Sequence, residues 1–478
     1  MKVPHLSKQF DDIQGMLGTG FGWLHSSRFW LLTIRDGRDN DARKWLAGFV
    51  RDGLVVSVAD VRKSRTHPVE KAAALAFSYS GITKLGCKET KAHPFPSPFR
   101  SGMGSELREL LLRDRPRQWR WSDVDGTDRV PVHVLIAEWT PRGAEPLVSD
   151  IDEEVFGIIK IDNDPCSFQK KKGDTKEKLR EAFGFRDGLA QPVIRGLREE
   201  QGAALKQAIR DAGPLYDDRV VAPGEFILGY RNEYDELTYC PNVEGWTGDA
   251  RHTDSRFGLN GSYLAVRQIE QNVKAFEKFR GTKNGKEFCE KLMGRRENGL
   301  PLSWKGDPDA SVSDSQADAF RFRVDDANGF GCPKGAHIRR VNPRDSLGVD
   351  VKSSIKSTKL HRLLRRGRPY LEKMENGAPR KGIFFISCNA DLDRQFEFIH
   401  QRWVRNPRFG CLHDQDDPVV GSSTSPKAFS IPGLASGEEI SLEALTKTLG
   451  GGYFFLPGIK ALEFIAGIVP SAAPKCGS

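Results

Sequence analysis

The chain has 478 residues, 38% of them hydrophobic and 29% charged, which excludes a disordered protein and indicates one large or two ordinary globular domains. The net charge of +9 is modest for this size, and without a recognisable motif the basic runs do not predict nucleic-acid binding. None of the eight cysteines forms a C-x-x-C pair, so neither a zinc knuckle nor a dithiol site is expected.

The chain carries no sequence signal for a membrane span or a secretory leader. Its most apolar window, residues 453–469, is interrupted by Pro457, Lys460 and Glu463, so we do not expect it to cross a bilayer. The N-terminal segment MKVPHLSKQFDD lacks the apolar core of a signal peptide. We therefore expect a cytoplasmic protein without a membrane partner, with leaderless secretion or a removed leader as the alternatives.

The first part of the chain alternates short apolar runs with segments of helical spacing, and residues 93–104 are rich in proline and glycine and predict an irregular loop. The predicted strands are 29–34, 54–58, 75–80 and 130–139, and the predicted helices are 42–50 and 82–85.

The second part repeats this alternation. Its predicted strands are 226–228, 263–267, 383–386 and 453–456, and the last three are each followed by apolar residues at helical spacing, beginning at 269, 392 and 459. Mixed strands and helices in both halves predict an α+β fold of two units, each a sheet covered by helices. The polar, lysine-rich stretch 166–179 is the expected junction, which gives domains 1–175 and 176–478. Residues 305–328 are polar and predict a long surface loop.

An acid between two glycines is the first candidate functional residue. Residues 183–192 read FGFRDGLAQP, with Asp187 between Gly184 and Gly188. Glycines let the backbone approach a ligand closely, so this acid is able to point into a pocket, although Asp-Gly pairs also form ordinary turns.

A histidine with small neighbours is the second candidate. His337 follows Gly335 and Ala336 in residues 331–344, GCPKGAHIRRVNPR. An imidazole with free space beside it suits a heme ligand, and the nearby Arg339, Arg340 and Arg344 suit the carboxylates of heme propionates. The alternative is a solvated basic loop.

A second arginine cluster lies downstream, in residues 361–370, HRLLRRGRPY. Arg365 and Arg366 follow two leucines, so at least one of them is able to face inward and stabilise negative charge on a bound oxygen. The alternative is a solvated helix face.

Together these segments resemble the dye-decolorizing peroxidase family of heme enzymes, and the resemblance covers nearly the whole chain. The segments that carry it are DIQGMLGTGFG (12–22), FGFRDGLAQP (183–192), PGEFILGY (223–230), NGSYLAVRQIEQNV (260–273), CPKGAHIRRVNPRDS (332–346), LLRRGRPY (363–370), CNADLDRQFEFIHQRW (388–403) and GGYFFLPGIKAL (451–462).

The resemblance implies two ferredoxin-like α+β units with antiparallel sheets, arranged like a dimeric α+β barrel, with heme b (iron protoporphyrin IX) in the C-terminal unit. Asp187 matches the distal acid, Arg365 the distal arginine and His337 the proximal iron ligand. Arg344 matches an arginine near a heme propionate. Gly184 and Gly188, which flank the acid, are assigned to the cofactor-binding loop.

Two positions depend on the branch of the family. The acid that accepts from the second nitrogen of the proximal imidazole is expected at Asp393, with Asp391 as the alternative. Some members carry an asparagine two residues after the distal arginine, where this chain has Gly367. The glycine suggests the branch of larger members and puts a distal amide in doubt.

The implied reaction is reduction of hydrogen peroxide with oxidation of small aromatic and dye donors at an acidic pH optimum. Asp187 transfers the peroxide proton and Arg365 stabilises developing charge. Bulky donors require a surface tryptophan or tyrosine, for which Trp304, Tyr370 and Trp403 are candidates, although core packing is the simpler role for each. A heme-handling, iron-releasing protein with incidental peroxidase activity is the alternative function, and a binding module without heme is a third. Both monomer and homodimer remain open.

Overall fold

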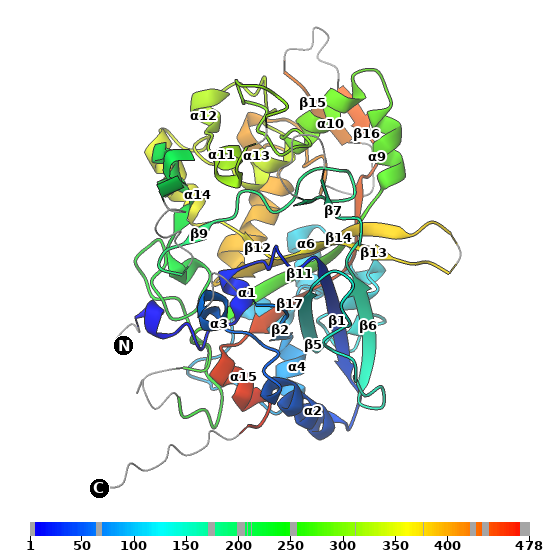
Figure 1. Cartoon of the computed structure of the whole chain (residues 1–478), viewed down its shortest axis with the longest axis vertical. Coiled ribbons are helices and arrows are strands. Elements are labelled where there is room, and N and C mark those ends of the chain that lie inside the picture. Colours follow the sequence, from blue (N-terminus) through cyan, green and yellow to red (C-terminus); the bar gives the residue numbers. More distant parts are fainter. Residues whose placement is uncertain are drawn as a thin grey trace.

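One continuous antiparallel sheet organises the protein. The computed structural model describes residues 5–63, 69–170, 177–197, 206–207, 209–211, 213–248, 256–310, 312–375, 377–420, 427–432 and 439–468. The neighbouring strands run in the order β12-β14-β11-β17-β2-β5-β1-β6, so that four strands from each half of the chain lie side by side (Figure 1).

The N-terminal half forms one ferredoxin-like unit, in which the strand order β2-β5-β1-β6 is antiparallel throughout. Its main elements are β1 (Ser26–Ile34), α2 (Asp39–Arg51), β2 (Ala72–Phe77), α4 (Tyr79–Lys84), β5 (Val134–Thr140) and β6 (Phe156–Asp162). Helix α2 buries Ala42, Leu46 and Phe49, which recur at helical spacing and cover one face of the sheet.

The C-terminal half repeats the same strand order, with β12 and β13 both paired to β14, then β11 and β17. Its main elements are β11 (Ser262–Gln271), α9 (Val273–Arg280), α10 (Gly285–Met293), α13 (His337–Val341), α14 (Val351–Lys359), β12 (Leu364–Arg365), β13 (Arg368–Glu372), β14 (Arg380–Asn389), two π-helical segments η5 (Asp393–Glu397) and η6 (Ile399–Val404), β17 (Thr446–Leu456) and α15 (Ile459–Ile465).

Shorter elements complete the fold: η1 (Leu6–Lys8), α1 (Gly15–Gly18), α3 (Val58–Lys63), α5 (Ser97–Ser101), α6 (Glu106–Leu112), η2 (Pro116–Gln118), β3 (Trp121–Ser122), β4 (Val130–Pro131), β7 (Phe168–Gln169), β8 (Lys178–Leu179), β9 (Val193–Ile194), η3 (Gly213–Leu215), α8 (Tyr216–Arg219), β10 (Val220–Val221), η4 (Pro223–Glu225), α11 (Asp314–Asp318), α12 (Phe322–Asp325), η7 (Phe409–Cys411), β15 (Lys427–Ser430) and β16 (Glu439–Leu442).

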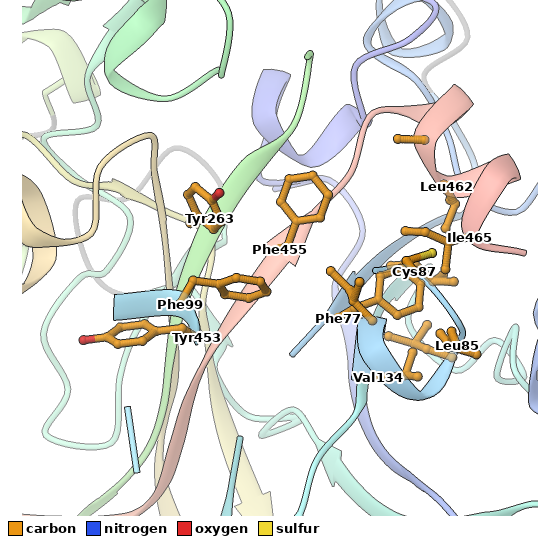
Figure 2. Close-up of a cluster of buried hydrophobic side chains, with 14 of the residues drawn as sticks. Phe77, Leu85, Cys87, Phe99, Val134, Tyr263, Tyr453, Phe455, Leu462 and Ile465 are labelled. Atoms are coloured by element: carbon orange, nitrogen blue, oxygen red, sulfur yellow. The ribbon is translucent and has the colours of Figure 1, made fainter. Parts of the chain in front are cut away.

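The two units close on each other as a barrel. Phe455 of β17 pairs with Phe77 of β2 at one seam, and Asn163 pairs with Tyr370 at the opposite seam. Figure 2 shows the first seam, where Phe77 and Phe455 lie among buried apolar side chains that include Leu462 from α15. The two halves of the sheet therefore share an apolar core, and the predicted pair of ferredoxin-like units is confirmed.

Four local predictions are wrong, and the other predicted strands and helices are present with shifted ends. Residues 93–104, expected to form an irregular loop, contain α5 and bury Phe95, Phe99 and Met103. Residues 54–58 form only isolated β-bridges, and residues 226–228 are buried but pair with no described strand. An apolar run indicates burial, and burial alone does not require the hydrogen-bonded pairing of a strand. The expected surface loop 305–328 contains α11 and α12 and buries Asp318, Phe320 and Phe322. The proposed domain boundary at 175/176 lies within 171–176, outside the described residues. Across the described part of the chain, no helix has the length and apolarity that a membrane crossing requires.

Candidate active site

The loop that carries Asp187 has the conformation that its glycines predict. Gly184 and Gly188 adopt φ values of 94° and 80°, in the left-handed region that favours glycine. The Asp187 backbone N–H donates to Leu179 O at 2.9 Å, and its Oδ1 accepts from Gly188 N at 2.6 Å. The carboxylate is half-buried at the edge of this loop.

Glu181 shapes the same loop from inside the protein. Its carboxylate accepts from Phe183 N at 2.8 Å and Phe185 N at 2.7 Å, and Gln271 donates a third hydrogen bond. Burial raises the pKa of Glu181 to about 7, against the effect of these three donors. No motif reasoning identified this residue, because an isolated glutamate before a loop carries no pattern of its own.

Arginines from the segment around β12 reach the Asp187 loop. Arg365 donates through Nη2 to Leu189 O at 2.7 Å, and its backbone N donates to Gln191 Oε1 at 3.0 Å. Arg362 donates to Ala190 O at 3.1 Å. The structure therefore brings Arg365 to the loop of Asp187, as predicted, and adds Arg362.

The remaining arginines of this segment bind the N-terminal motif. Arg366 donates to Met16 O and, at 2.9 Å, to Leu17 O, while Arg368 donates to Gly20 O and Phe21 O, each at 2.9 Å. Burial lowers the pKa of Arg368 to about 10, and the negative charge of Asp187 opposes this shift. Arg368 is thus a further cation near the acid that the sequence did not reveal.

The close approach of the β14 backbone explains why position 367 is a glycine. A Cβ at this position would meet Phe384 O at 2.2 Å and Ile386 N at 2.9 Å, both on β14. An asparagine is therefore sterically excluded here.

His337 begins α13 and is held by a buried acid. Its Nδ1 lies 2.9 Å from Oδ2 of Asp417, which is fully buried and also accepts from Val419 N at 2.8 Å and Val420 N at 2.9 Å. Burial raises the pKa of Asp417, but His337, the Val420 amide and Arg340 outweigh it and lower the value to about 2. The ionised acid places the imidazole proton on Nδ1, and Nε2 has no protein partner among the described residues.

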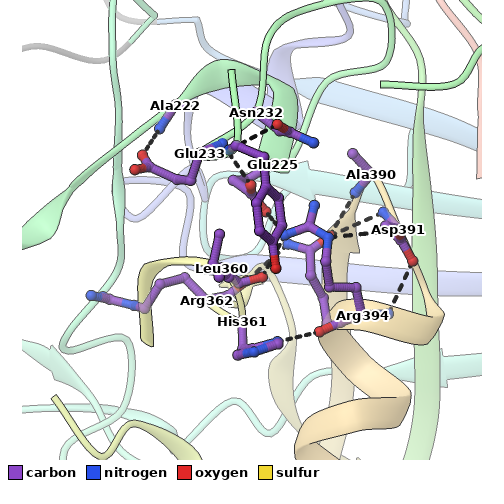
Figure 3. Close-up of polar contacts among 12 residues, drawn as sticks. Ala222, Glu225, Asn232, Glu233, Leu360, His361, Arg362, Ala390, Asp391 and Arg394 are labelled. Atoms are coloured by element: carbon purple, nitrogen blue, oxygen red, sulfur yellow. Dashed lines mark hydrogen bonds and ion pairs between the residues drawn. The ribbon is translucent and has the colours of Figure 1, made fainter. Parts of the chain in front are cut away.

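This pairing corrects the expectation for Asp393 and Asp391. Asp391 Oδ1 caps the start of η5 by accepting from Arg394 N at 2.9 Å (Figure 3). Asp393 is largely exposed and lies 3.8 Å from Arg108. Asp391 and Asp393 lie shortly after β14, at the start of η5, whereas Asp417 contacts His337 from a separate loop. Its acidic stretch, HDQDDP, gives no local spacing signal that connects it to His337.

A buried cluster of guanidiniums surrounds one carboxylate. Arg344 donates to Asp318 O at 2.9 Å and to the Asp318 carboxylate, and Arg295 lies 3.6 Å from the same group. Burial, together with the charges of Arg344 and Arg365, lowers the pKa of Arg295 and of Arg362 to about 10, while Asp318 opposes the shift. The cluster carries excess positive charge.

The other two arginines near His337 have structural contacts. Arg340 is fully buried and donates to backbone carbonyls that include Trp403 O at 2.8 Å and Asn406 O at 3.0 Å. Arg339 donates to Cys332 O at 2.9 Å. Only Arg344 of the three therefore joins the cationic cluster.

Of the three candidates for a surface radical, two are buried. Tyr370 is 0% exposed and Trp403 is 6% exposed, so neither meets a bulky donor directly. Trp304 is half-buried.

These residues fit a heme. An imidazole anchored by an anion offers one free nitrogen to iron, and the guanidinium excess at Arg295, Arg344 and Arg362 suits two propionates. Asp187 and Arg365 supply a proton acceptor and a cation on neighbouring loops.

Comparison with known proteins shows which proteins this chain is similar to. The model of the "Dyp-type peroxidase, C-terminal" family matches residues 242–421. A dye-decolorizing peroxidase of Exidia glandulosa is 27% identical over 95% of this chain and 86% of its own length. A multifunctional dye peroxidase of an Amycolatopsis species is 30% identical over 42% of this chain and 48% of its own length. The crystal structure of a fungal DyP-type peroxidase from Auricularia auricula-judae has the same fold, with a TM-score of 0.72 at 21% identity, over 96% of this chain and 99% of that one.

The barrel of two ferredoxin-like units, the family-model match and the similarity to dye-decolorizing peroxidases together identify the class of this chain as heme peroxidase. The chain belongs to the dye-decolorizing peroxidase family.

Proposed function

We propose that this protein binds heme b and reduces hydrogen peroxide while oxidising dyes, phenols and other one-electron donors, at an acidic pH optimum. The observation that carries the proposal is the His337–Asp417 pair, which leaves the other imidazole nitrogen, Nε2, available to bind iron. The relatives' names support dyes as the donor class.

The heme-binding residues have distinct tasks. His337 would hold the heme iron through Nε2, and Asp417 would increase its electron donation by accepting the hydrogen bond from Nδ1. Arg344 would pair with a propionate, and the glycines at 184 and 188 would shape the loop beside the cofactor. Bound heme would supply the electrons that break the peroxide bond and would store the oxidising equivalents for the donors.

Proton transfer and charge stabilisation are the tasks of the two segments that carry Asp187 and Arg365. Asp187 accepts a proton from hydrogen peroxide and returns it to the departing oxygen. Arg365 stabilises the negative charge that develops as the O–O bond breaks. A carboxylate stays ionised at a lower pH than an imidazole does, so this base works in acid, where a histidine base is protonated.

Absorption spectroscopy of the heme-loaded protein tests the proposal. We expect hydrogen peroxide to change the heme spectrum and a phenol to restore it. Failure to take up heme, or heme that ignores peroxide, would contradict the proposal. Release of iron that leaves the porphyrin intact would instead support a heme-handling protein.

A further inference from the structure

A buried ion pair between Glu225 and Arg394 lies outside the proposed peroxide site and contacts residues 360–365, the segment that carries Arg365. Glu225 is fully buried, and its Oε2 accepts from Nη1 of Arg394 at 2.7 Å (Figure 3). Its Oε1 accepts from Glu233 N at 2.9 Å, and its backbone O accepts from Ala390 N at 3.0 Å. Glu225 thus fixes Arg394 from a loop that precedes β11.

The same nitrogen of Arg394 holds the segment that carries Arg365. Nη1 also donates to Leu360 O at 2.7 Å, and the next residue, Gln395, donates through Nε2 to Arg362 O at 3.0 Å. Between them, His361 bonds through Nδ1 to Arg394 O (Figure 3). Three successive residues, 360–362, are therefore tied to η5.

The contacts continue from this segment to the Asp187 loop. Arg362 donates to Ala190 O at 3.1 Å, and Arg365 donates to Leu189 O at 2.7 Å. A chain of direct hydrogen bonds thus runs from Glu225 through Arg394 to the segment that presents Arg365. Two of these bonds fix backbone carbonyls of the segment, Leu360 O and Arg362 O, so the chain restrains the backbone of the segment and not only one side chain.

We propose that Arg394, clamped by Glu225, is a positioning residue that holds segment 360–365 so that Arg365 faces the loop of Asp187. The consequence for peroxide chemistry rests on the function proposed above, whereas the restraint on the segment does not. The carboxylate of Asp391 contacts Arg394, at its backbone N and at Nε (3.6 Å), and the Asp391 backbone exchanges hydrogen bonds with Gln395.

Three substitutions separate the proposal from a general packing role. Because one nitrogen makes both contacts, Arg394→Lys retains a donor for Glu225 and Leu360, whereas Arg394→Met removes both bonds. Asp391→Asn changes a carboxylate of the same cluster and leaves the bonds of Arg394 to Glu225 and Leu360 in place, so it is the matched control.

Hydrogen exchange in the heme-free protein tests the restraint directly. We expect about tenfold faster exchange of amides in residues 359–365 for Arg394→Met, partial restoration in Arg394→Lys and no change in Asp391→Asn. Equal exchange in Arg394→Met and the parent would overturn the proposal. If Arg394→Met does not fold, Glu225→Gln replaces it, with the same expected and contradicting results.

Fluoride affinity of the heme-loaded protein, which reports hydrogen-bond donors beside the iron, tests the effect on Arg365. We expect Arg394→Met to weaken fluoride binding about tenfold and to slow the peroxide reaction roughly ten- to hundredfold, with recovery in Arg394→Lys. Unchanged fluoride affinity together with an unchanged peroxide rate would overturn the positioning role. If Arg365→Leu reacts normally with peroxide while the exchange effect persists, the role proposed for Arg365 in the peroxide reaction fails and the restraint stands.

Discussion

Nδ1 of His337 and Oδ2 of Asp417 form a 2.9 Å hydrogen bond between a helix start and a loop that lies far downstream in the chain. The Asp417 side chain is 0% exposed and also accepts hydrogen bonds from two backbone amides, so it remains ionised within the protein. An anionic acceptor fixes the imidazole's orientation and makes its other nitrogen a stronger electron donor.

Asp417→Asn should therefore weaken the histidine as an iron ligand without removing it. We expect heme affinity to fall about ten- to hundredfold and the heme reduction potential to rise, because a neutral amide stabilises the oxidised iron less. Heme titration and spectroelectrochemistry measure both quantities. Asp391→Asn is the control, and a shift of equal size in that variant would show that the acid acts through the fold.

The candidate site residues could be proposed from the sequence, but their buried partners could not. Asp187, His337 and Arg365 lie in segments that resemble motifs of the family, and the structure places Arg365 against the loop of Asp187. Asp417 and Asp318 act on residues that are distant along the chain, so no local spacing reveals them. Their assignment requires the tertiary fold.

The fold was predictable where the apolar pattern matched a paired strand. The prediction for β1, β14 and β17 was correct because each apolar run lies in a strand that pairs with other strands on both of its sides. Residues 226–228 have the same apolar character but are buried in a turn after η4. Short apolar runs report burial and do not distinguish a strand from a packed turn.

Asp187→Asn should separate proton transfer from heme binding. The amide cannot accept the peroxide proton, so we expect the peroxide rate to fall about 10²- to 10⁴-fold while heme remains bound. His337→Ala should show the opposite pattern, with loss of heme retention itself. Stopped-flow absorption and heme titration distinguish the two. An undiminished rate in Asp187→Asn would assign the proton chemistry to Arg365 or to water.

Asp318→Asn should destabilise the heme-free protein more than the heme-loaded protein. Asp318 is the carboxylate that offsets Arg295, Arg344 and Arg362, so its neutralisation leaves buried positive charge, at a cost of about 3 kcal/mol. Bound propionates would offset the same arginines and reduce this loss. Urea unfolding of both forms measures the difference, and equal losses would argue against propionates at this cluster.

Glu181→Gln should flatten part of the pH dependence of stability. Burial raises the pKa of Glu181 to about 7, so between the unfolded value of 4.5 and about 7 the folded state holds more protons than the unfolded state. Stability therefore falls as pH rises through this window, by about 3 kcal/mol from this residue. Urea unfolding of the heme-free protein at about pH 5 and about pH 7 measures the slope. Part of the slope should persist in the variant, because burial raises the pKa of Asp12 to about 6.

Gly367→Ala should destabilise the protein although it adds a single methyl group. The new Cβ would lie 2.2 Å from Phe384 O and 2.9 Å from Ile386 N, so either β12 or β14 must move. Overpacking of this kind costs about 1–3 kcal/mol, and movement would also displace Arg365, which precedes the glycine by two residues. Gly48→Ala is the matched control, because its Cβ meets nothing within 4 Å inside helix α2, where alanine is favoured by up to about 1 kcal/mol. Urea unfolding of the two heme-free variants compares them. If Gly367→Ala is as stable as the parent, the close approach of β14 does not explain why this position lacks the amide found in other members of the family.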